Sequence, residues 1–189
     1  SAILHDIGAL KLQQLPDAED LDDGTKEVVK KNTQETLDRY GDLDEEVLRL
    51  ITQMQELYTR ESDAEIPAGL KESVNANILY VADAYDRMTA MKSFEEPTSE
   101  VKAVRELLAD EERYNKKIVN ALIHGISILY PGVCVELSNG EKGLVITENE
   151  DNIFEPTVLD FRNNNLYDLS DPSVKQTIEI ADVMKTMDN

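Results

Sequence analysis

The chain has 189 residues, 41% of them hydrophobic, which is enough for one sizeable core and for one or two compact units. Its 19 Lys and Arg residues against 39 Asp and Glu residues give a formal net charge of -20, which repels polyanions and excludes nucleic acid as an expected partner. No apolar stretch reaches the roughly 20 residues that span a bilayer, so we expect no membrane insertion. The single cysteine, Cys134, excludes an internal disulfide, and we expect a reducing compartment, the cytoplasm.

Apolar residues recur at helical spacing in four stretches of the N-terminal half, and each stretch predicts a helix. The stretches contain Ile3, Ile7 and Leu10; Val28, Val29 and Leu37; Val47, Leu50, Ile51, Met54, Leu57 and Tyr58; and Val74, Ile78, Val81, Tyr85 and Met88. The first helix would carry His5 and Asp6, and the third would begin with a capping box of Asp42 and Glu45. The fourth pattern is the clearest, and we expect it to line the core. Segments 16–24 and 60–69 are interpreted as loops.

Two further helical patterns precede a change of periodicity. They contain Val101, Val104 and Leu108, and then Ile118, Leu122, Ile126 and Leu129, with Pro131 and Gly132 ending the second. Beyond Pro131 apolar and polar residues alternate, and Asn139-Gly140 predicts a two-residue hairpin turn between strands at 133–137 and 143–147. A strand is expected at 156–161, then a turn through three asparagines at 163–165, and a last strand at 177–180.

These elements predict a mainly α fold with a small C-terminal β-rich extension. The helical domain would cover residues 1–130 and the β-rich subdomain residues 131–189. The two parts differ in the period of their apolar residues, which is near 3.6 in the first and 2 in the second. No internal repeat or low-complexity tract interrupts either part.

Two places in the helical part could carry chemistry. His5 and Asp6 are adjacent, and they could ligate one metal only if the fold brought further ligands from other helices. Asp83 lies beside the expected core positions Val81 and Ala82, where a carboxylate needs a cation or a hydrogen-bond network. These residues alone do not identify a reaction.

Three segments resemble landmarks of HD-GYP domains, the branch of the HD phosphohydrolases that hydrolyses cyclic di-GMP. The segments are AILHDIGALKL, ANILYVADAYDRMTAMKSF and LYPGVCVELSNGEKGLV. They occur in the family's order and extend over nearly the whole chain, and the last is typical of the family's C-terminal β extension. The resemblance implies an HD-domain helical bundle. Because the chain opens almost on His5, we expect the first helices of that bundle to precede it.

The family's activity depends on a metal centre held by His and carboxylate ligands, where metal-activated water attacks the phosphodiester. The resemblance implies that His5 and Asp6 are the His-Asp pair and that Asp83 is the metal-binding Asp of a later helix. A residual site of these three residues would hold iron, manganese or a similar divalent ion. Lys92 matches one of the family's two phosphate-contacting arginines and is the only matched basic contact.

Several departures remove residues that the family uses. Ala9 replaces a Lys, and Asn32 replaces a ligand His. The family's His-His-Glu triplet corresponds best to Met54, Gln55 and Glu56, and the GYP signature loop is replaced by AEIPAGL. Methionine and glutamine are poor ligands for hard or borderline divalent metals. The other histidine of the chain, His124, lies on a different predicted helix, so this chain alone cannot build a His-rich cage.

Two interpretations of His5, Asp6 and Asp83 therefore remain, a residual metal site or a cluster retained for its hydrogen bonds, and we favour the second because it needs no missing ligand. His124 is expected to be a packed or partly exposed helical residue. Cys134 is expected to be inert.

We expect a degenerate HD-GYP-like signalling module that does not hydrolyse cyclic di-GMP and acts in regulation or protein interaction, with a protein partner or as a homodimer. Unpaired strand edges in the β-rich part favour such an interaction. One alternative is a metal-dependent cyclic di-GMP phosphodiesterase with a reduced metal site. A second alternative is a nucleotide receptor without catalysis that binds cyclic di-GMP through Lys92.

Overall fold

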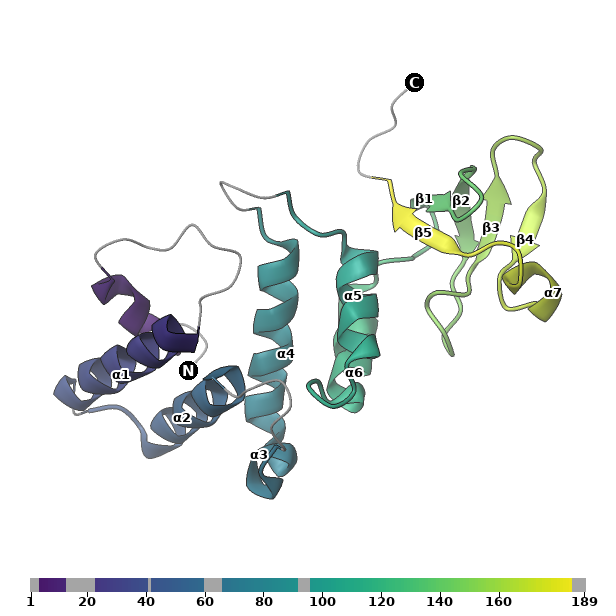
Figure 1. The fold of residues 1–189 in the computed structure, drawn as a ribbon. Helices are drawn as coiled ribbons and strands as arrows, with labels where there is room; N and C mark the ends of the chain where they lie inside the picture. The colour runs from purple at the N-terminus through teal and green to yellow at the C-terminus, as the bar shows by residue number, and fades with distance from the viewer. Residues whose placement is uncertain (1–3, 13–22, 41, 60–65, 92–95, 185–189) are drawn as a thin grey trace. The chain divides into compact units, whose positions relative to one another are not determined.

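The computed structural model describes residues 4–12, 23–40, 42–59, 66–91 and 96–184. Within these ranges the chain is mainly α-helical with one small antiparallel sheet, as the sequence predicts (Figure 1). The helices are η1 (Ile7–Lys11, a 3-10 helix), α1 (Asp23–Arg39), α2 (Glu45–Thr59), α3 (Ala68–Glu72), α4 (Val74–Thr89), α5 (Glu100–Ala109), α6 (Lys116–Ile126) and α7 (Pro172–Lys175). The strands are β1 (Cys134–Leu137), β2 (Lys142–Thr147), β3 (Thr157–Asp160), β4 (Leu166–Asp168) and β5 (Ile180–Val183). Among these helices none combines the length and the apolar character needed to cross a membrane.

Contacts group the chain into two compact units that interleave along the sequence. The first comprises Ser1–Pro97 with Asp110–Ile118, and the second comprises Thr98–Ala109 with Val119–Asn189. Helices η1 to α4 therefore belong to the first unit, and α5 and the sheet belong to the second. The division into domains at residue 130 stays a prediction.

The first unit differs from the sequence prediction at three helix boundaries. His5 and Asp6 lie in a turn before η1, so the prediction that a helix carries them is wrong, and the 3-10 helix begins at Ile7. Helix α2 is capped by Asp44, whose carboxylate accepts a hydrogen bond from the Glu46 amide at 2.8 Å, rather than by Asp42. The short helix α3 begins at Ala68, inside the segment 60–69 that is predicted as a loop, and ends at Glu72 with Ser73 as its C-cap residue.

Helix α4 confirms the predicted helix but turns a different face to the core. Val74 and Ile78 are 59% and 47% exposed, although both belong to the predicted apolar stripe. The buried face consists of Ala76, Asn77, Tyr80, Val81 and Ala84. Small alanine side chains let a neighbouring helix approach closely, and α2 packs against α4. The packing partner, not the size of the apolar side chains, decides which face is buried.

The second unit contains an antiparallel sheet with strand order β4-β3-β2-β1-β5 (Figure 1). The hairpin between β1 and β2 is confirmed, but its loop has three residues, because the Leu137 amide donates to the Glu141 carbonyl at 2.8 Å. A two-residue type I′ turn needs positive φ at both central residues, and here Gly140 has φ 79 whereas Asn139 is not in that region. Asn164, in the predicted asparagine turn, adopts a left-handed conformation with φ 57.

Three further details of this unit were not predicted. Helix α6 ends at Ile126, before a residue with positive φ, Ser127, and not at Leu129. The last strand is Ile180–Val183 rather than 177–180, and the short elements β4 and α7 lie between the predicted strands. One face of the sheet carries the core of the unit, which consists of Val101, Leu129, Val135, Leu137, Val145, Val158, Leu169, Ile178 and Ile180.

Candidate functional site

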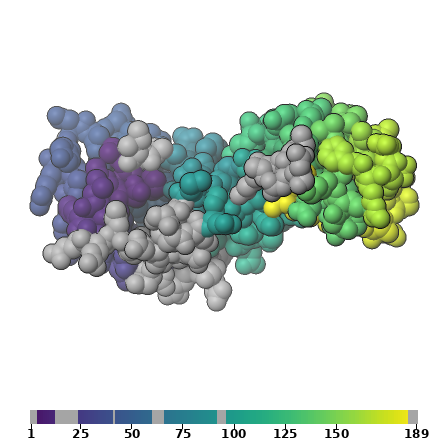
Figure 2. Space-filling view, turned by 90° about the horizontal axis from the view of Figure 1, so that it is seen from above, coloured from purple at the N-terminus to yellow at the C-terminus, as the bar shows by residue number. Residues whose placement is uncertain are grey.

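The N-terminal segment is attached to α1 through Gly8. The Gly8 amide donates to Thr33 Oγ1 at 3.0 Å, and Asn32 Nδ2 donates to the Gly8 carbonyl at 3.4 Å. A Cβ at Gly8 would collide with the Val29 carbonyl oxygen and the Thr33 amide nitrogen, so only glycine allows this close approach. In the space-filling view of Figure 2, the purple atoms of the N-terminal segment lie against the blue atoms of the residues that follow it. Asn32, which matches a ligand His of the family, thus acts here as a backbone tether.

A second tether comes from α2. Gln55 Nε2 donates to the His5 carbonyl at 3.0 Å, and Gln55 is only 7% exposed. Of the three residues matched to the His-His-Glu triplet, Met54 is buried in the core at 2% exposure and Glu56 is exposed. Of the three, Gln55 is thus the residue that places a hydrogen-bond donor at the backbone of His5.

The imidazole of His5 lies against the carboxylate of Asp83 on α4. His5 Nε2 and Asp83 Oδ1 are 3.2 Å apart, and their side chains are 20% and 18% exposed. The two residues are far apart in the sequence, and the tethers from α1 and α2 position the His5 segment beside α4. The structure thus brings together two of the three residues that the sequence predicts for a metal site.

The other oxygen of Asp83 is bound by an arginine one helical turn later. Arg87 Nη2 lies 2.5 Å from Asp83 Oδ2 at the i,i+4 spacing that places two side chains on one helix face. The Arg87 guanidinium also lies over the ring of Tyr58 on α2, 4.2 Å from the ring centroid. Both carboxylate oxygens of Asp83 therefore already have a donor.

The pKa of Asp83 reflects these contacts. Burial alone would raise it, but the hydrogen bond from His5 and the positive charge of Arg87 outweigh burial and hold the pKa below its usual value of 3.8. The carboxylate is thus ionised at neutral pH with its charge compensated by protein groups. We call His5, Asn32, Gln55, Asp83 and Arg87 the His5 cluster.

The remaining predicted site residues lie elsewhere. Asp6 is exposed and its side chain does not cap η1. Lys92 lies outside the described residues. His124 is exposed on α6. Across the described parts of the chain, no group of three or more His, Cys, Asp or Glu side chains could hold a metal ion.

The side chains of the His5 cluster do not fit a divalent metal centre. A metal bound by Asp83 would lie beside the positive charge of Arg87, which repels a cation. The two amides direct N–H groups, which cannot bind a cation, at backbone carbonyls. The described residues do not reach the ligand count that a hydrolytic centre requires. The resulting arrangement is a polar cluster that compensates one carboxylate and ties three helices to one turn.

Sequence reasoning did not identify Arg87, Tyr58 or Thr33 as members of this environment. The i,i+4 spacing of Asp83 and Arg87 could have indicated the ion pair. Tyr58 and Thr33 carried no local signal, because their contacts depend on how α1 and α2 pack.

Comparisons of the chain with protein-family models, with curated proteins and with solved structures found no match.

Proposed function

We propose that this chain is an HD-GYP-like module that no longer hydrolyses cyclic di-GMP and acts in regulation or protein interaction. The observation that carries the proposal is the double occupation of the Asp83 carboxylate by His5 and Arg87. A positive guanidinium stands where a metal-dependent enzyme would need a cation that can activate water. Arginine stays protonated and has no lone pair to offer a metal, so it supplies charge compensation without Lewis acidity.

The positions of the two amides support the same proposal. Asn32 and Gln55 match ligand positions of the family by sequence, and both lie in the environment of the His5 segment. Positions that match a metal cage in sequence and also converge in space favour common ancestry with that cage. Their amide side chains favour a hydrogen-bonded relic of it over a working centre.

Elemental analysis of the purified chain, combined with a cyclic di-GMP turnover assay, tests the proposal. We expect no stoichiometric iron, manganese or zinc and no hydrolysis. Stoichiometric metal with turnover would instead support the alternative of a reduced-site phosphodiesterase, which also predicts that His5→Ala abolishes turnover. Calorimetric binding of cyclic di-GMP without turnover would support the receptor alternative.

A gain-of-function variant tests whether the cluster occupies a former metal site. The double variant Asn32→His and Gln55→His, combined with Arg87→Ala, offers three imidazoles and one free carboxylate, and we expect it to bind about one divalent ion per chain. The control is Gln34→His and Thr52→His with Arg87→Ala, because these exposed residues lie on the same two helices. Equal metal content in both triple variants would contradict the proposed origin of the cluster.

A further inference from the structure

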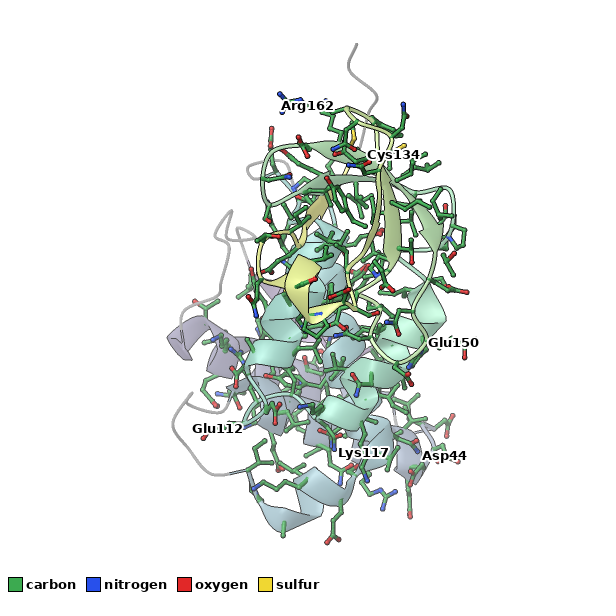
Figure 3. The ribbon with its side chains drawn as sticks, turned by 90° about the vertical axis from the view of Figure 1, so that its right-hand side faces the viewer. Asp44, Glu112, Lys117, Cys134, Glu150 and Arg162 are labelled. Atoms are coloured by element: carbon green, nitrogen blue, oxygen red, sulfur yellow. The ribbon has the colours of Figure 1, made fainter. Side chains whose placement is uncertain are left out.

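The face of the sheet that does not carry the core has one apolar side chain on or beside each strand. Cys134, Leu144, Leu159 and Leu166 are successive Cα partners across β1, β2, β3 and β4. Met184, directly after β5, donates its amide to the Cys134 carbonyl at 2.9 Å and continues the line. We call these five residues the outer row; Cys134 is labelled in Figure 3.

The outer row lies opposite the core. Successive residues of a strand point to opposite faces, and the neighbours of the outer row, Val135, Val145 and Val158, are fully buried in the core cluster. No member of the outer row belongs to that cluster. Leu166 is 63% exposed, and the other four are half-buried. A line of apolar side chains across a whole sheet face is typical of a surface that another protein covers.

One acidic and one basic residue stand side by side next to the outer row. Glu136 and Lys142 are Cα partners on β1 and β2, and both are exposed. Within the described ranges neither takes part in an ion pair, whereas the next residue along this line, Asp182, pairs with Lys102 at 3.2 Å. Opposite charges on one face allow the face to be complementary to itself.

We propose that this face binds a second copy of the chain. A two-fold axis that runs parallel to the strands between β1 and β2 places β1 of one copy over β2 of the other. Glu136 of each copy then faces Lys142 of the other copy. The same axis places Cys134 over Leu144 and Met184 over Leu159, so the apolar row covers itself across four strands.

The high net charge of the chain means that self-association needs a face that is complementary to itself. A net charge of -20 makes two copies repel one another, and a contact must offset that repulsion locally. Two reciprocal Glu136 to Lys142 pairs beside an apolar row provide such an offset. This inference does not rest on the proposed function, since the outer row and the His5 cluster belong to different units.

Sedimentation equilibrium of the full chain over a range of concentrations tests the inference. We expect a reversible dimer in the unaltered chain. Glu136→Lys alone and Lys142→Glu alone should each raise the Kd about tenfold or more, because both attractive pairs become repulsive. An equimolar mixture of the two variants should recover the affinity, because each lysine at 136 then faces a glutamate at 142.

Matched controls separate this effect from net charge. Glu148→Lys and Lys117→Glu change the net charge equally at exposed positions outside the face, and we expect the Kd to change less than for the face variants. A chain that stays monomeric at every concentration overturns the inference. So does a dimer that the single variants leave intact, or a mixture of the two variants that does not recover the affinity.

Discussion

The His5 cluster and the sheet stabilise the chain in different ways. In the cluster, polar side chains from α1, α2 and α4 hold one short turn, and each has a specific donor or acceptor. In the sheet, buried and less buried residues alternate along β2 and β3, so the burial of a side chain depends on the face to which it points. Removing one partner of a polar contact breaks that single contact. Removing volume from an apolar core lowers the free energy of unfolding by an amount that grows with the cavity left behind. The effects of substitutions on the free energy of unfolding should therefore differ between the two regions in magnitude and in pH dependence.

The largest effect is expected in the core face of the sheet. Leu137→Ala removes a side chain that is 1% exposed and should lower the free energy of unfolding of the second unit by about 3 kcal/mol. Hydrogen exchange of the β1 and β2 amides reports this unit separately from the helices. A loss below about 1 kcal/mol would mean that the site collapses around the smaller side chain.

The close approach at Gly8 should give the next largest effect. Gly8→Ala places a Cβ against backbone atoms of Val29 and Thr33, which cannot move away without disturbing α1, and should cost about 2 kcal/mol. Urea unfolding followed by circular dichroism measures the loss. Gly69→Ala is the matched control, because a Cβ there meets no atom within 4 Å and should stabilise α3 slightly.

The ion pairs of Asp83 should give a smaller, pH-dependent effect. Asp83→Asn should cost about 1 kcal/mol near neutral pH, where the carboxylate is charged. Because the folded pKa of Asp83 is lowered, its contribution is fully present above the usual value of 3.8 and is lost as the pH falls through the folded pKa. The difference in the free energy of unfolding between the unaltered chain and the variant should therefore become smaller as the pH falls below 3.8.

Unfolding midpoints of both proteins across this pH range provide the measurement. Asp86→Asn, at an exposed position of the same helix, removes an equal charge and serves as the control. A difference between the unaltered chain and Asp83→Asn that stays constant down to strong acid would show that packing rather than charge explains the loss.

The smallest effect is expected on the outer face of the sheet. Leu144→Ala removes a half-buried side chain that lies outside the core and should change the free energy of unfolding by about 0.5 kcal/mol or less at low protein concentration. Comparison with Leu137→Ala measures how much more the core face of the sheet contributes to the free energy of unfolding than the outer face does. A loss as large as that of Leu137→Ala would show that the outer row is already covered within one chain.

Local patterns were sufficient for most of the secondary structure. Helical spacing located α1, α2, α4, α5 and α6, and alternation located the hairpin and β3, because both periods arise from neighbours in the chain. The short elements α3, β4 and α7 were missed, since a segment of three to five residues is too short for its helical or strand period to repeat. The capping residue of α2 was misplaced because Asp42 and Asp44 are equally suited by type, and only the backbone geometry distinguishes them.

The sequence by itself determined that the chain is mainly helical with a small β-rich end, and the resemblance singled out His5, Asn32, Gln55 and Asp83. Only the tertiary structure decided what these residues do, because His5 and Asp83 meet through the packing of three helices. It also decided that Arg87, and not a ligand of the predicted kind, holds the second oxygen of Asp83. Spacing along a chain specifies local conformation, whereas the partner of a buried charge depends on which distant side chains reach the same place.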